Sequence, residues 1–180
     1  SWHTDFAAKW SGAIANTYST QFTDAATEKA AAGNLPALET GKTTGQDILE
    51  ARIADILADG FDPAKITSAT VFENPSNYYI VYYWNASHYA DPGHIPGAIQ
   101  YTPKESMQLA EDLKTLPTDK TIVVYCYTGQ TSAFLSAYLR LIGYDAKSLL
   151  FGTNGMIYDA MVEKEMTVYN AEQTMDYDYE

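Results

Sequence analysis

Apolar residues in the first third of the chain follow a helical period. Large apolar side chains recur at every fourth position near the start, at Trp2, Phe6, Trp10, Ile14 and Tyr18. An alanine-rich run follows over residues 25–32, so the pattern predicts helix over residues 1–32. A second amphipathic pattern between Thr44 and Gly60 predicts another helix, and Thr44 with Asp47 forms a variant of the capping box at its start.

The chain from about residue 61 onward contains strand patterns separated by helix patterns. Runs of β-branched and aromatic residues predict buried strands at 78–84, 121–125 and 147–151, with a short strand near Ile99. We expect the segments 80–83, 121–125 and 148–151 to form the centre of one sheet. Because helix patterns lie between the strands, the sheet is expected to be mostly parallel and covered by helices, which is an α/β fold.

Three helices are predicted within this α/β region. Thr102, Pro103 and Glu105 resemble a capped helix start, and the expected inner face of that helix comprises Met107, Ala110 and Leu113. The helix that follows the strand at 121–125 is expected to turn Phe134, Ala137, Tyr138 and Leu141 inward and to end at Gly143. A short third helix is expected around residues 156–162.

These patterns divide the chain into three parts. Residues 1–60 form a helical extension, which we expect to pack on the rest because its apolar stripe is too large to remain in water. Residues 61–165 form the α/β domain. Residues 166–180 form an acidic tail whose end has no helix or strand period, so we expect the tail to be flexible.

Composition narrows the possible partners. The 180 residues include 11 Lys and Arg against 23 Asp and Glu, which leaves a formal net charge of −12. A chain this acidic does not attract a nucleic-acid backbone or an anionic membrane, so neither is expected as a partner. No apolar run approaches the ~18–20 residues of a membrane span. The composition leaves the oligomeric state open.

The chain has one cysteine, Cys126, and three histidines. It cannot form an internal disulfide, and a zinc centre would need carboxylate ligands, so we expect no metal site and no cofactor. The chain begins at Ser1 without a signal-peptide pattern, which we interpret as a trimmed or mature boundary. The expected compartment is exported or periplasmic, with the cytoplasm as the alternative.

Cys126 lies directly between a predicted buried strand and a predicted helix. In open α/β sheets ligands bind beyond the carboxyl ends of the strands, and a helix start offers unpaired N–H groups and partial positive charge. Loop amides around the sulfur would favour the thiolate and hold a negatively charged product. A lone cysteine is more often a buried structural residue, but this position favours a nucleophile.

Three segments of the sequence carry motifs that can be compared with known families. The loop Cys126-Tyr127-Thr128-Gly129-Gln130-Thr131-Ser132 resembles the active-site loop of rhodanese-like sulfurtransferases. Gly93-His94-Ile95-Pro96-Gly97-Ala98 resembles its upstream signature, and Phe151-Gly152-Thr153-Asn154-Gly155-Met156 its glycine turn after the last strand. The resemblance covers about residues 61–165 and does not extend to residues 1–60.

The resemblance implies a rhodanese-like central parallel sheet and a persulfide mechanism. Cys126 would be the catalytic nucleophile that takes a sulfane sulfur from a persulfide, polysulfide or thiosulfate donor and passes it to a thiol or cyanide acceptor. The amides of Tyr127, Thr128, Gly129, Gln130, Thr131 and Ser132 would bind the terminal sulfur. The hydroxyls of Thr128, Thr131 or Ser132 would add hydrogen bonds, and Gly129 would let the loop curl.

Departures from the family pattern keep alternatives open. A phosphatase or arsenate-reducing relative would carry an arginine where this chain has Ser132. Tyr82 and Trp84 stand where family members usually carry Asp-x-Arg, and the loop has no Lys or Arg. These departures favour an alternative, a non-catalytic docking or persulfide-carrying module of the same fold, and they predict that thiosulfate is a poor donor.

Other candidate residues have simpler explanations. His94 could act as a base, but in the family it belongs to a structural turn. His88, Asp91 and His94 are spaced loosely like metal ligands, although a solvated loop is the better interpretation. The tyrosine-rich strand at 78–84 is interpreted as core with some interface.

Overall fold

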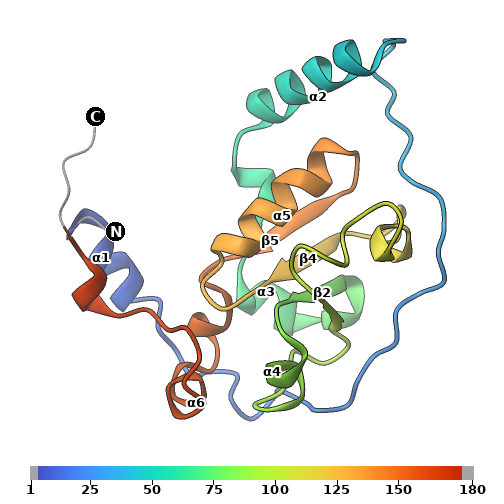
Figure 1. Ribbon diagram of the computed structural model, residues 1–180. Coiled ribbons are helices and arrows are strands. Elements are labelled where there is room, and N and C mark those ends of the chain that lie inside the picture. The colour runs from blue at the N-terminus through green and yellow to red at the C-terminus, as the bar shows by residue number, and fades with distance from the viewer. Residues whose placement is uncertain (1–3, 176–180) are drawn as a thin grey trace.

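The computed structural model describes residues 4–175, and its centre is a parallel sheet of five strands (Figure 1). The strands are β1 (Lys65–Ile66), β2 (Tyr79–Tyr83), β3 (Ile99–Tyr101), β4 (Ile122–Tyr125) and β5 (Ala146–Leu149). They are ordered β1-β5-β4-β2-β3, with Val81 paired to Val124 on one side and to Ile99 on the other. The three predicted central strands therefore lie in one sheet, and the predicted α/β class is confirmed.

Burial on both faces explains why the central strands are almost uniformly apolar. Every residue of β4 is buried, and Ile80 and Tyr82 of β2 face one core while Val81 and Tyr83 face the other. Helices α3 (Ser68–Glu73), α4 (Ala86–Ala90) and α6 (Tyr158–Glu163) contribute to the first core. Helix α5 (Gln130–Leu141) covers the second core together with the segment after β3.

Short 3-10 turns connect these elements: η1 (Asp62–Ala64), η2 (Pro75–Asn77), η3 (Asp112–Thr115), η4 (Gly152–Gly155) and η5 (Ala171–Gln173). Among the helices formed within residues 4–175, none has both the length and the apolarity needed to cross a bilayer.

The prediction of continuous helix over residues 1–32 is wrong beyond the first helix, α1 (Thr4–Ser11). Residues 12–44 instead run along the outside of the domain as an extended strap (Figure 1). Backbone hydrogen bonds attach the strap at Ala15, whose N–H donates to Asn154 O, and at Thr23, which pairs in both directions with His94. Such tertiary hydrogen bonds outweigh the weak helix preference of the alanine-rich run. Residues 1–3 lie outside the described residues.

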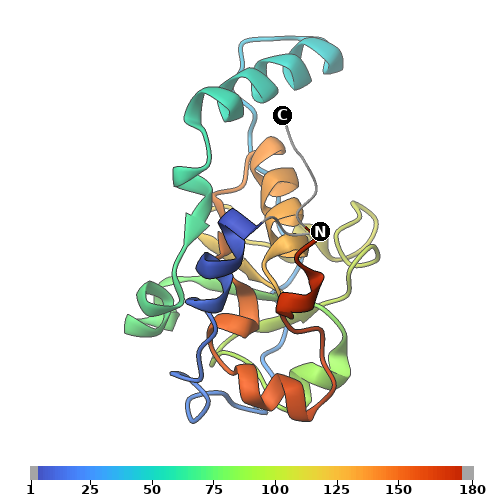
Figure 2. The same ribbon diagram turned by 90° about the vertical axis from the view of Figure 1, so that its left-hand side faces the viewer.

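Helix α2 (Gly45–Asp59) forms as predicted, and the Thr44 side chain accepts a hydrogen bond from the Asp47 N–H. However, none of its residues is buried, so most of its apolar stripe stays at the surface, and whether residues 1–60 as a whole pack on the domain stays a prediction. The helix stands away from the sheet and lies beside α5 (Figure 2). Arg52 holds it there by donating hydrogen bonds to the carbonyl oxygens of Arg140 and Leu141 at the end of α5.

Two predictions about helices after β3 are wrong. The segment after Thr102 forms turns and η3 rather than an amphipathic helix, because Lys104 adopts φ +68° and its N–H donates to the Tyr83 hydroxyl. In α5 the buried residues are Ser132, Leu135, Ser136 and Leu139, whereas Phe134 and Tyr138 are exposed. The contacts of Ser132 with the preceding loop and with β5 set this rotation.

The first residues of the segment 166–180, expected to be a flexible tail, lie in the core. Met166 and Tyr169 are buried, and the Tyr169 N–H donates to Asn154 Oδ1 at 2.7 Å. Residues 176–180 lie outside the described residues, so the division of the chain near residues 60 and 165 stays a prediction.

Candidate active site

Cys126 follows β4 directly, at the carboxyl end of the central strand. The Cys126 side chain is buried, with 2% of its surface exposed, and its Sγ accepts a hydrogen bond from the Ser132 N–H at 3.4 Å. Gly129 has φ +87° and caps α5, which lets the chain curl from Cys126 into the first turn of that helix. The sulfur therefore faces the positive end of the α5 dipole.

The residues of the predicted binding loop have different environments. Thr128, Gly129 and Thr131 are half-buried, Gln130 is exposed at the start of α5, and Tyr127 and Ser132 are buried. The Ser132 hydroxyl donates to Gly129 O at 3.0 Å and contacts the Ser148 hydroxyl at 2.8 Å. The Ser132 amide thus meets the sulfur, whereas its hydroxyl holds the loop against β5 instead of donating to sulfur as expected.

A second turn, η4, supports the loop from behind. The Thr153 N–H donates to Cys126 O at 3.0 Å, and Asn154 Nδ2 donates to Tyr127 O at 2.7 Å. Gly152 lies so close that a Cβ placed on it would be 2.2 Å from Cys126 O. The glycine turn that the sequence motif indicated therefore holds the backbone of the cysteine loop.

The ring of Tyr127 belongs to an aromatic cluster with Trp84 and His88. Its ring centroid lies 4.9 Å from that of Trp84, and its hydroxyl is hydrogen-bonded to His88 Nδ1. Burial raises the pKa of Tyr127 to about 12, so its hydroxyl remains protonated near neutral pH.

Tyr82 and Trp84, at the positions of the usual Asp-x-Arg pair, both lie near the loop. Tyr82 is buried, and among the described residues its hydroxyl has no hydrogen-bond partner. Burial raises the pKa of Tyr82, and the neighbouring Tyr127, Tyr125 and Cys126 raise it further. The chain at this end of β2 therefore presents neutral aromatic groups beside the cysteine.

His94 lies outside this cluster and has structural contacts. His94 is fully buried, and its ring nitrogens lie 2.7 Å from Tyr89 O and 3.2 Å from Ala25 O. Asp91 pairs with Lys164 at 2.6 Å. Within residues 4–175 no three His, Cys, Asp or Glu side chains are arranged to bind a metal ion.

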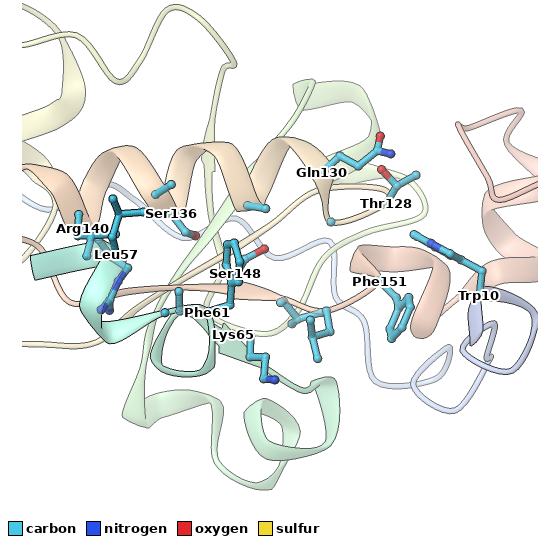
Figure 3. Close-up of a pocket in the computed structure, with 18 residues that line it drawn as sticks. Trp10, Leu57, Phe61, Lys65, Thr128, Gln130, Ser136, Arg140, Ser148 and Phe151 are labelled. Atoms are coloured by element: carbon cyan, nitrogen blue, oxygen red, sulfur yellow. The ribbon is translucent and has the colours of Figure 1, made fainter. Parts of the chain in front are cut away.

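A cavity of about 500 Å³ opens beside the cysteine loop and includes Thr128, Gly129 and Gln130 in its lining (Figure 3). Trp10 of α1 lines one end, where its ring meets that of Phe151 edge-on at 5.0 Å. Sequence reasoning did not assign Trp10, Ser148 or Asn154 to the site. Of these three residues, only Asn154 had a sequence signal, because it belongs to the motif at 151–156.

Comparisons with known proteins identify a family over the region that contains the cysteine loop. The family model for the rhodanese-like domain matches residues 68–157. A rhodanese-related protein from Thermoplasma volcanium is 23% identical, with 59% of this chain and 97% of that chain covered and a TM-score of 0.44. A rhodanese-like domain protein from Staphylococcus aureus is 21% identical over 51% of this chain and 89% of that chain, with a TM-score of 0.44.

A larger protein also matches over this region. A NAD-dependent persulfide reductase from A. fulgidus is 27% identical over 60% of this chain but only 18% of that chain, with a TM-score of 0.42. No curated protein matches the chain. With the family model matching half of its length, on the strand, cysteine loop and glycine turn described above, the chain belongs to the rhodanese-like domain family.

Proposed function

We propose that this protein is a sulfurtransferase that carries sulfane sulfur on Cys126. The Cys126 thiolate attacks the outer sulfur of a donor such as R–S–SH. A new S–S bond to Cys126 forms as the donor S–S bond breaks, and the thiolate RS⁻ leaves with the bonding electrons. A thiol or cyanide acceptor then attacks the terminal sulfur and releases the Cys126 thiolate.

The observation that carries this proposal is the hydrogen bond from the Ser132 N–H to Cys126 Sγ at the start of α5. The same amide and the helix dipole would stabilise the negative charge of the thiolate and of the persulfide. We assign Tyr127, Thr128, Gly129, Gln130 and Thr131 to the remaining wall of the sulfur site. Because Cys126 is only 2% exposed, small donors are favoured over bulky ones.

Intact-mass measurement tests the proposal directly. Wild-type protein incubated with glutathione persulfide or polysulfide should gain the mass of one sulfur atom, and a reductant should remove it. A protein that takes up no sulfur from persulfide, polysulfide or thiosulfate would contradict the proposal.

That negative result would favour the docking form of the second candidate, which is a docking or persulfide-carrying module without turnover. The specific observation in its favour is that neutral Tyr82 and Trp84 occupy the strand end where the family pattern has charged residues. A protein that takes up sulfur but releases none to cyanide or thiols would also support this second candidate.

We predict a larger kcat/KM for small persulfides than for thiosulfate. Thiosulfate carries two negative charges, the protein carries −12, and residues 126–132 contain no Lys or Arg. Only amides and a helix end then offset the repulsion, each by about 0.3–1 kcal/mol at an exposed terminus. Steady-state kinetics at low and moderate salt should show the preference, and a preference for thiosulfate at both salts would refute it.

Gln130→Arg should raise kcat/KM for thiosulfate about two- to fivefold at low salt, because it adds a cation at the start of α5. Gln108→Arg is the matched control, since Gln108 is an exposed glutamine on the segment between β3 and β4. It changes the net charge equally, so an equal gain in both variants would show that overall charge rather than a local contact is responsible.

A further inference from the structure

Two neighbouring hollows lie between α2, α5 and β5. The cavity of about 500 Å³ beside the cysteine loop shares Ile56, Leu57 and Ala137 with a second hollow of about 360 Å³ between α2 and α5. The two hollows therefore adjoin across these shared side chains, and together they are called the groove below. Each of the two volumes falls within the range of small-molecule sites, which is about 300–1,000 Å³.

Large apolar side chains at this groove lie in contact with water. Leu57 is 75% exposed, Phe61 89% and Phe134 76%. Apolar area left in water costs roughly 25 cal/mol per Å², and a cluster of such residues marks a binding surface more often than a bare exterior. A ligand in the groove would shield these side chains from water.

One buried polar group faces the same space. Ser136 is 1% exposed, and its hydroxyl has no hydrogen-bond partner among the described residues. Figure 3 shows the Ser136 side chain extending from α5 toward the cavity and β5. An unpartnered buried hydroxyl is unfavourable, so a polar atom of a ligand would be stabilised there.

The two cationic side chains that line the groove each form an ion pair with a carboxylate. Arg140 pairs with Asp59 at 3.1 Å, and Lys65 pairs with Asp62 at 2.5 Å. An anionic headgroup would have to compete with these carboxylates in a protein of net charge −12. The site therefore favours an uncharged ligand.

We propose that this groove binds a neutral, mostly aliphatic small molecule with one hydrogen-bonding oxygen that pairs with the Ser136 hydroxyl. The class comprises medium-chain alcohols and ketones. The site adjoins the cysteine loop through Thr128, Gly129 and Gln130 but does not depend on sulfur chemistry. Binding is therefore expected in Cys126→Ser as well, so that its failure and the failure of the proposed function are distinguishable.

Titrations with 1-octanol, octanoate and 1-chlorooctane, followed by amide chemical shifts in NMR, test the site. Saturable shifts at Gly129, Ala133 and Ser136 should appear with 1-octanol, and octanoate should bind more weakly. Ser136→Ala should weaken 1-octanol about fivefold, the equivalent of one hydrogen bond, and leave 1-chlorooctane unchanged. Ser87→Ala, on α4, is the matched control and should change neither affinity.

Further variants make the test decisive. Ala133→Phe places a ring in the cavity and should abolish binding of both neutral ligands. Ser136→Ala should fold with an unchanged or higher melting temperature, because it removes an unpartnered hydroxyl. Absence of saturable binding, or an equal loss of 1-octanol and 1-chlorooctane in Ser136→Ala, would overturn the proposal. So would a dimer in sedimentation that disperses on Phe134→Ser, since a second copy would then occupy the groove.

Discussion

Cys126→Ser should abolish sulfur uptake completely while the protein remains folded. Cys126 is the only cysteine in the chain, so no other side chain can form a persulfide that a reductant removes. Serine has nearly the same shape, and its oxygen can accept the Ser132 N–H bond that now goes to sulfur. The expected cost in stability is therefore small, no more than about 2 kcal/mol for a buried hydroxyl.

Intact mass before and after reductant, together with a thermal melt, checks both parts of this prediction. Cys126→Ala is the control for the new hydroxyl, and it should behave like Cys126→Ser in uptake. Sulfur mass gained by Cys126→Ser, whether or not a reductant removes it, would mean that a group other than Cys126 holds the sulfur. The proposed nucleophile would then be wrong even though the fold is intact.

The sheet and the cysteine loop could be predicted because their signals are local. Residues 121–125 are apolar at nearly every position, which is typical of a strand buried on both faces, and Cys126 follows immediately. The Thr44 cap likewise lies within one turn of the helix that it begins. In each case the residues that determine the structure are neighbours in the sequence.

The wrong predictions concern segments whose structure is determined by residues far apart in the sequence. The alanine-rich run at 25–32 has helical propensity, yet its flanking residue Thr23 pairs with His94 and holds the strap extended. In α5 both faces carry apolar residues, so the period alone could not choose between Phe134 and Leu135. The contact between Ser132 and Ser148, 16 positions apart, determined which face became buried.

The close approach of η4 to the cysteine loop also depends on distant residues. Asn154 joins Tyr127 O to the Tyr169 N–H, and so connects three separate segments. The motif at 151–156 predicted a turn, but its position behind the loop follows only from the fold. This arrangement makes Gly152 the most sensitive backbone position of the site.

Gly152→Ala should destabilise the protein by more than about 4 kcal/mol, an unusually large effect for one methyl group. The added Cβ would lie 2.2 Å from Cys126 O and 2.7 Å from Tyr127 O, both backbone atoms. Relief requires η4 or the cysteine loop to move, which would break the hydrogen bonds of Thr153 and Asn154 to that loop. Thermal melting should show a decrease on the order of 10 °C or more, and the fraction that remains folded should take up sulfur more slowly.

Gly41→Ala separates this collision from simple backbone strain. Gly41 has φ +68° and Gly152 φ +54°, so both occupy the left-handed region, but a Cβ on Gly41 would meet no atom within 4 Å. Its cost should be only that of the left-handed conformation, about 1–2 kcal/mol, with normal sulfur uptake. If the two variants lose equal stability, the contact with the loop carries no energy of its own. If Gly152→Ala alone loses both stability and uptake, η4 is required to keep Cys126 facing the start of α5.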